Sequence, residues 1–169
     1  QRQEIKNKMS HMKRKSSPRT WSVPRKGTKY LTSPYPGKNL ELSMPLNLIL
    51  RDVLKIASTR REVRIMLHNK DIVVNGKSAV TEKAPIGLFD TITVAKLKKS
   101  YRLIINNNRK IDVEEINDSE AKTIVCKVIG RKSLNGKKTQ INLFNGRNVL
   151  SDLKVKTNDS LIVDFGKGS

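Results

Sequence analysis

The 169-residue chain has little of the chemistry that disulfide-bonded proteins, metalloproteins and membrane proteins need. A single cysteine excludes an internal disulfide framework and any metal site built from several cysteines. Aromatic residues make up only 4% and hydrophobic residues 36%, which predicts small aliphatic cores with part of the chain outside them. No run of about 18 apolar residues occurs, so no transmembrane helix is expected.

Residues 1–10 also lack the apolar stretch of a signal peptide. The first residue is Gln1 rather than Met, which is compatible with a trimmed or processed N-terminus. We therefore expect a soluble, intracellular protein.

Positive charge is the most abundant feature of the chain. It carries 35 Lys and Arg against 15 Asp and Glu, a net charge of +20, which predicts a polyanionic partner. Nucleic acid is preferred over an anionic membrane because no basic amphipathic helix is evident. Half of the excess, +10, lies in residues 1–39, which also hold four of the six prolines. We expect residues 1–42 to be an extended basic tail that is disordered when free and ordered only against a partner.

Residues 43–97 have the pattern of a small α+β module. Apolar residues at helical spacing predict a helix from Leu46 to Ala57, with Pro45 in its first turn. Thr59 and Glu62 form a capping box that begins a second helix, which continues to about His68. Further strands and turns follow: a hairpin centred on Asn75-Gly76 that returns over 77–81, a turn or loop at 85–87, and a closing strand at 91–94.

Residues 98–169 are predicted to be mostly β-strand and to form a small β-barrel-like domain. The strand-like stretches are separated by turn signals, of which Asn135-Gly136 and Asn145-Gly146 are the clearest. A short helical turn is expected at 118–122, before the strand-like stretch that begins at residue 123.

No constellation of residues supports catalysis or a cofactor. His11 and His68 lie far apart and have no metal ligand at suitable spacing, and His68 is best explained as a surface residue near a helix C-terminus. Cys126 is expected to be a small buried hydrophobe, and the pair Glu114-Glu115 a solvated loop. We expect no enzyme, no cofactor, no metal and no small-molecule substrate.

Cations and aromatic rings are interleaved in the tail, as suits phosphate neutralisation combined with stacking on unpaired bases. Three arginines open the second helix, where the helix dipole disfavours cations, so an RNA phosphate at that end is a physical reason for them. The candidate RNA-binding residues are Lys13, Arg14, Lys15, Arg19, Trp21, Arg25, Lys26 and Lys29 in the tail, and Arg51, Lys55, Arg60, Arg61, Arg64, Lys70 and Lys77 in the module.

These motifs match a known family. The helix–capping box–helix–hairpin unit resembles the alpha-L type RNA-binding module of bacterial ribosomal protein S4, pseudouridine synthases and some tRNA synthetases. From about residue 11 to 165 the chain resembles more closely the archaeal/eukaryotic small-subunit ribosomal protein S4e family. The motifs that carry this resemblance are His11 to Pro18, Trp21, Pro24 to Gly27, Pro45-Leu46, Leu50-Arg51-Asp52, Gly87 to Asp90, and Asn158-Asp159.

The resemblance implies a structural constituent of the small ribosomal subunit, located in the cytoplasm. It would bind rRNA and neighbouring ribosomal proteins and would not form a homo-oligomer. Two departures stand out: residues 1–10 have no counterpart, and the family's C-terminal KOW domain is missing through loss or shortening. The rival interpretation is a free RNA-binding factor that acts on tRNA or in ribosome assembly. A remote third is an RNA-modifying enzyme, for which 169 residues leave little room.

Overall fold

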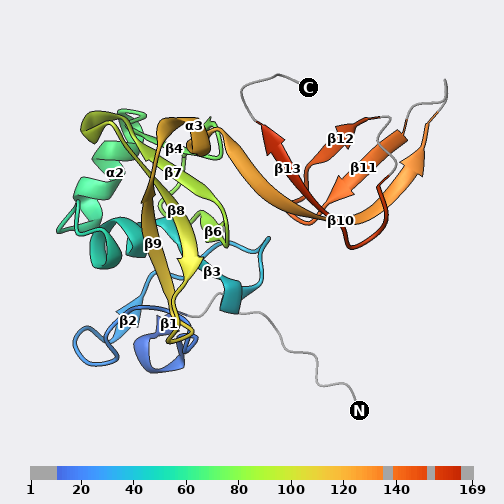
Figure 1. Cartoon of the computed structure of the whole chain (residues 1–169). Helices are drawn as coiled ribbons and strands as arrows, with labels where there is room; N and C mark the ends of the chain where they lie inside the picture. Colours follow the sequence, from blue (N-terminus) through green and yellow to red (C-terminus); the bar gives the residue numbers. More distant parts are fainter. Residues whose placement is uncertain (1–10, 135–138, 152–154, 165–169) are drawn as a thin grey trace, which may run out of the picture.

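The computed structural model describes residues 11–134, 139–151 and 155–164. They form two units, each built around its own sheet, which are joined through α3 and the long, curved strand β10 (Figure 1). The strands of the first unit are β1 (Met12–Lys13), β2 (Tyr30–Leu31), β3 (Ser43–Pro45), β4 (Ile72–Val74), β5 (Lys77–Ser78), β6 (Pro85–Gly87), β7 (Thr91–Val94), β8 (Lys99–Ile105) and β9 (Ile111–Ile116). Its helices are α1 (Leu46–Leu48) and α2 (Arg60–His68), and α3 (Asp118–Ala121) leads to the second unit. The second unit has strands β10 (Thr123–Ser133), β11 (Thr139–Leu143), β12 (Asn148–Leu150) and β13 (Ser160–Asp164).

Two consecutive helices occur as the sequence predicts, although helical structure in the first ends at Val53 rather than at Ala57. The apolar stripe that begins at Leu46 forms α1, which continues directly into a π-helical turn at Ile49–Val53. Pro45 occupies the N-cap position just before the first turn. At α2 the capping box is complete, because Thr59 Oγ1 accepts from the Glu62 amide at 3.3 Å and Glu62 Oε2 accepts from the Thr59 amide at 3.4 Å.

The hairpin prediction is also confirmed. Asn75 and Gly76 connect β4 to β5 with φ of 49° and 76°, the left-handed pair that a type I′ turn requires. The predicted turn at Pro85–Gly87 is wrong. This stretch is strand β6, which pairs antiparallel with β3, so that Met44 lies opposite Ile86. Pro85 and Pro45 face each other at one end of the pair, where their missing N–H groups cost the ladder little.

The expectation of an unstructured tail is wrong for residues 11–42. β1 and β2 pair with each other, and Trp21 makes a parallel bridge to Ile111 at the start of β9. The Trp21 side chain is only 3% exposed, and its Nε1 donates to the Ser43 carbonyl at 2.8 Å. The segment folds because this large ring, together with Leu31, Met12 and Val23, supplies apolar contacts to the first core.

The boundary expected at residue 98 does not match the sheet. Strands β8 and β9 continue the sheet of the first unit, whose order is β5-β4-β7-β8-β9. The pair Glu114-Glu115 lies on β9 rather than in a loop. Because β8 and β9 join it, the first unit extends to Ile116.

The second unit is a bent, four-stranded antiparallel sheet of order β12-β11-β10-β13. β10 pairs with β13 along its first half and with β11 along its second half, with an irregularity between Val128 and Gly130. Within the described residues no pairing closes β12 onto β13, so the observed part of the expected barrel is an open sheet. The Asn135-Gly136 turn signal lies outside the described residues.

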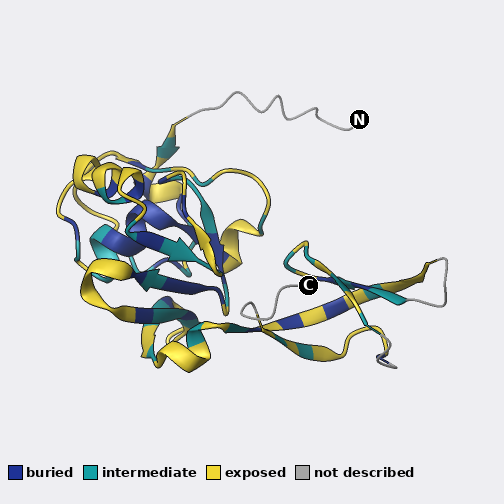
Figure 2. Cartoon of the chain, turned by 90° about the horizontal axis from the view of Figure 1, so that it is seen from above, coloured by how far each residue is buried: buried dark blue, intermediate teal, exposed yellow. Residues whose placement is uncertain are grey.

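Two separate apolar cores hold the units. The first gathers residues from the N-terminal segment, α1, α2 and the sheet, including Met44, Leu50, Val63 and Leu103. The second lies on one side of β10, whose residues alternate between buried and exposed along the strand (Figure 2). Cys126 belongs to this second core and is 4% exposed, as predicted for a small buried hydrophobe. Burial also raises the pKa of its thiol, which keeps the group protonated and unreactive.

Candidate nucleic-acid interface

A basic groove runs along one side of α2. It has a volume of about 610 Å³ and lies between α2, the strand-to-strand segment after β5, and Tyr35 of the N-terminal segment. The side chains that line it are Tyr35, Arg60, Arg64, Leu67, His68, Lys70 and residues 78–83. Three of the sequence-predicted residues, Arg60, Arg64 and Lys70, therefore meet at one feature.

Glu82 holds two of these arginines in place. The carboxylate is only 7% exposed, and it accepts from Arg60 Nε at 2.8 Å and from Arg64 Nε at 3.0 Å. Hydrogen bonds from Arg60, followed by those from Arg64, lower the pKa of Glu82 to about 2. The two arginine side chains remain 46% and 62% exposed, so Glu82 positions them while they stay accessible to solvent.

The remaining predicted cations of the module fall into two groups. Arg51 forks onto its neighbour Asp52, with Nη2 and Nε donating to the carboxylate at 2.8 and 3.1 Å, and is half-buried. The other four side chains are exposed and make no ion pair within the described part of the chain; they are Lys55, Arg61, Lys70 and Lys77. These four side chains are therefore available to pair with the phosphates of a partner.

In the N-terminal segment, Arg14 is a structural residue. The residue is 7% exposed, and its guanidinium donates to the Pro24 carbonyl at 2.6 Å, to the Thr28 carbonyl at 2.9 Å and to Thr28 Oγ1 at 2.7 Å. Arg14 therefore ties the loop between β1 and β2 together. The prediction that it contacts RNA is not supported by this placement, because every direction of the guanidinium fork is turned inward.

Trp21 is likewise unsuited to the role that sequence reasoning assigned to it. Its ring lies in the first core, so it has no free face on which a base can stack. The other tail candidates are exposed: Lys13, Lys15, Arg19, Arg25, Lys26 and Lys29. Of these, Arg25 is held by the carbonyls of Lys15 and Ser17 at 2.9 and 3.3 Å.

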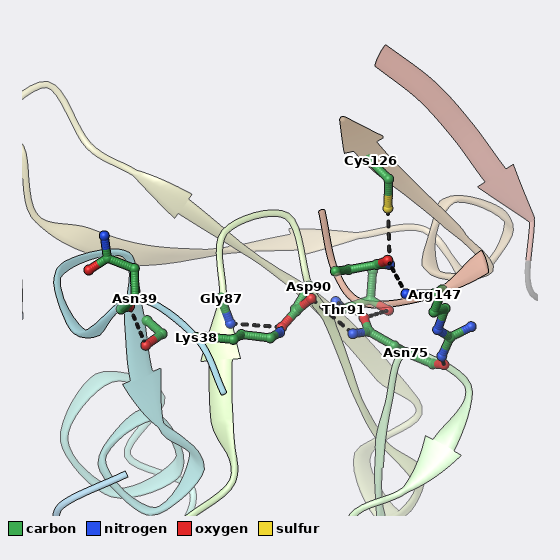
Figure 3. A network of polar contacts seen from close by, with 10 residues as sticks. Lys38, Asn39, Asn75, Gly87, Asp90, Thr91, Cys126 and Arg147 are labelled. Carbon is green, nitrogen blue, oxygen red and sulfur yellow. Dashed lines mark hydrogen bonds and ion pairs between the residues drawn. The ribbon is translucent and has the colours of Figure 1, made fainter. Parts of the chain in front are cut away.

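A polar network centred on Asp90 connects the N-terminal segment to both sheets (Figure 3). Asp90 is buried and forms an ion pair with Lys38, and it accepts from the Gly87 amide at 2.7 Å and from Asn75 Nδ2 at 2.9 Å. Asn75 Oδ1 accepts in turn from the Thr91 amide at 2.9 Å. These hydrogen bonds of Asn75 hold the β4–β5 turn, which lies next to the basic groove, against the buried Asp90.

The same turn contacts the second unit. Arg147, between β11 and β12, donates to the Asn75 carbonyl at 3.0 Å. Nearby, Asn145 Nδ2 lies 3.1 Å from Cys126 Sγ. One residue of the β4–β5 turn therefore joins the module to the second sheet.

Sequence reasoning missed two residues that shape the groove, Glu82 and Lys83. Glu82 carried no signal because its partners are 18 and 22 positions away and only the fold brings them together. Tyr35 was noted as one of the aromatic residues of the tail, but nothing in the sequence places it beside α2.

Other kinds of site find no support in the described residues. No group of three or more His, Cys, Asp or Glu suited to a metal ion occurs in the parts that the structure covers. None of the helices in residues 11–134, 139–151 and 155–164 has the length and hydrophobicity to cross a membrane.

Comparison with known proteins defines the family in two steps. The first is structural: the crystal structure of the 30S ribosomal protein S4e from Thermoplasma acidophilum superposes with a TM-score of 0.60 at 28% identity, covering 74% of this chain and 65% of that one. The second is sequence. The model described as "Ribosomal family S4e" matches residues 97–169.

Curated relatives named "Small ribosomal subunit protein eS4" extend this match over most of the chain. The protein of Methanocella arvoryzae is 36% identical over 91% of this chain and 65% of its own length, and that of Archaeoglobus fulgidus 37% over 90% and 64%. The Nanoarchaeum equitans protein is 35% identical over 92% of this chain and 67% of its own length. The chain belongs to the ribosomal S4e family, which confirms the resemblance found in the sequence. It spans about 65% of the length of the first two relatives.

Proposed function

We propose that this chain is a structural, non-enzymatic constituent of the small ribosomal subunit that binds rRNA. Membership of the S4e family supports this role, since its curated relatives are named as small-subunit proteins. In this proposal the chain works in the cytoplasm within the ribosome, beside rRNA and neighbouring ribosomal proteins. It needs no cofactor, no membrane and no second copy of itself.

The observation that carries the RNA-binding part is the arrangement of cations around α2. Arg60, Arg64 and Lys70 line one groove, and Arg61 lies exposed on the same helix. Glu82 and the polar network around Asp90 hold this surface in shape before any partner arrives. A rigid array of cations binds a phosphate backbone by releasing its counterions, and it reads the shape of the backbone rather than the sequence.

The exposed lysines of the N-terminal segment, together with Arg19, add a second contact surface on the same unit. Lys13, Lys15, Arg19, Lys26 and Lys29 project from a segment that Arg14 and Trp21 anchor to the core. Because the segment is folded onto the unit, it presents its charges as a loop rather than as a free, threading tail.

Sedimentation separates this proposal from the rival, a free factor acting on tRNA or in ribosome assembly. A cell lysate is run on a sucrose gradient after a high-salt wash, and the fractions are probed for the chain. We expect co-migration with small subunits that survives the wash. Release into the top fractions would support the free factor instead.

Substitution of Arg61 tests the RNA surface directly. Arg61→Ala removes one exposed cation of α2 without disturbing Glu82, whereas changes at Arg60 or Arg64 also unpair that carboxylate. We expect weaker binding to folded small-subunit rRNA and a salt slope lower by about 1, the value for one lost phosphate contact. Lys122→Ala, which removes an exposed cation beyond α3, is the matched control and should leave the slope unchanged.

A further inference from the structure

The groove beside α2 combines an apolar patch with a cationic rim. Val80 is 85% exposed and Tyr35 43% exposed, and both line it together with the buried Leu67 and Ala79. A surface that serves only phosphates has no use for exposed apolar side chains. Such a mixture instead suits a ligand that carries both a flat apolar part and negative charge.

Tyr35 is held at this groove by the backbone. Its amide donates to the Lys83 carbonyl at 2.9 Å, which ties the N-terminal segment to the strand-to-strand segment before β6. The ammonium of Lys83 lies 5.5 Å from the centroid of the Tyr35 ring, a cation–π distance. The ring is therefore positioned in advance, yet almost half of its residue surface remains open to solvent.

The cations of the rim are not all occupied by the protein. Glu82 engages Arg60 and Arg64, whereas the side chains of His68 and Lys70 make no hydrogen bond or ion pair within the described part of the chain. The ammonium of Lys83 lies over the Tyr35 ring and makes no ion pair within the described residues. Lys70 and Lys83 are thus the charges best placed to meet a phosphate at the rim while a ring lies on Tyr35.

We propose that this groove binds one unpaired nucleotide of the RNA, with its base stacked on Tyr35 beside Val80 and its phosphate between Lys70 and Lys83. This inference rests on the proposed function, and it adds to phosphate binding a subsite for a bulged or flipped-out base. An acidic peptide fits less well, because carboxylates have no flat ring for Tyr35. Stacking accepts any base, so the subsite selects for an unpaired nucleotide rather than for a sequence.

The test uses the full chain and two labelled RNA hairpins with the same stem, one fully paired and one with a single bulged nucleotide. We expect the bulged hairpin to bind about tenfold more tightly, the value for one stacked base. Tyr35→Ala should abolish this preference, and Tyr35→Phe should retain it because the ring remains. Lys26→Ala, which removes a cation that does not line the groove, should weaken both hairpins equally.

The outcomes separate the subsite from the proposed function. Equal binding of the two hairpins by the unmodified chain would overturn the subsite and leave phosphate binding intact. A preference that survives Tyr35→Ala, or that is retained when the bulge is an abasic ribose, would also overturn it. Displacement of the bulged hairpin by oligoglutamate as readily as by unlabelled RNA would show recognition of charge alone. Failure of both hairpins to bind would count against RNA binding by this chain and against the subsite with it.

Discussion

The two units of the molecule differ in how completely their sheets are covered. In the first unit, 17 hydrophobic residues among those described are buried in one core formed by the N-terminal segment, the helices and the sheet, so the sheet has a thick apolar layer behind it. Among the described residues of the second unit, six hydrophobic residues are buried in a smaller core that β10 and β11 share with Val155. The opposite side of the sheet exposes Val125 at 40% and its cross-strand partner Ile162 at 75%.

This difference explains where the candidate interface lies. Cations are useful for shape recognition only when their backbone is held rigidly, and the first unit supplies that support through its core, Glu82 and the Asp90 network. The second unit has less buried apolar area, so its stability depends on fewer contacts. The two units can therefore be separated by substitutions that act on packing, on pairing or on the open face.

Replacement of Trp21 is the most damaging change to the thick core. Trp21→Ala deletes a ring that is 97% buried and the hydrogen bond from Nε1 to Ser43, so the free energy of unfolding should fall by about 4 kcal/mol. Urea unfolding followed by circular dichroism measures the loss. Tyr30→Ala, which truncates a 48% exposed ring of the same segment, is the control and should cost far less. Equal losses for the two variants would contradict the anchoring role of Trp21.

Replacement of Glu82 tests the support beneath the basic groove. The folded-state pKa of Glu82, about 2, lies below the ordinary value of 4.5, so its pairing contributes stability above pH 4.5 that is lost as the pH falls towards 2. Since Arg60 and Arg64 are partly solvated, we expect Glu82→Gln to cost about 2 kcal/mol at pH 7.

The pH dependence identifies the cause. The difference in unfolding free energy between the unmodified chain and Glu82→Gln should shrink between pH 4.5 and 2. Glu41→Gln, which changes an exposed carboxylate, should show no such difference at any pH. A cost at Glu82 that is independent of pH would mean that packing, rather than charge pairing, holds the segment before β6.

Local signals in the sequence were sufficient for two features of the first unit, the start of α2 and the β4–β5 turn. The capping box at Thr59 and the Asn75-Gly76 turn depend on residues within a few positions of each other, so the sequence alone predicts them correctly. The prediction for Pro85–Gly87 failed because the strand pairs with a distant segment: Ile86 lies opposite Met44, 42 positions away. Pro45 and Pro85 also obscure the strand pattern. Propensity describes a residue and its neighbours, whereas pairing depends on the whole fold.

The candidate site shows that the sequence is equally limited in predicting which charged and aromatic residues contact a partner. Sequence reasoning found the arginines of α2, and the structure gathers Arg60 and Arg64 in one groove. It did not foresee that Arg14 and Trp21 are buried, because the pattern of cations and rings in the tail is equally typical of a surface that contacts RNA and of one anchored by a single buried ring. A ring that closes a core and a ring that stacks on a base have the same sequence signature, and only burial distinguishes Trp21 from Tyr35.

The open face of the second sheet should tolerate polar substitution almost without cost. Ile162→Thr keeps a β-branched residue on β13 and changes a side chain that is 75% exposed, so the free energy of unfolding should change by no more than about 0.5 kcal/mol. Ile141→Thr is the matched control, since Ile141 is 1% exposed and its hydroxyl would enter the second core. Unfolding by urea should separate the two variants clearly. A large loss at Ile162 would mean that its face is covered in the folded chain, and the contrast between a thickly covered and a thinly covered sheet would no longer hold.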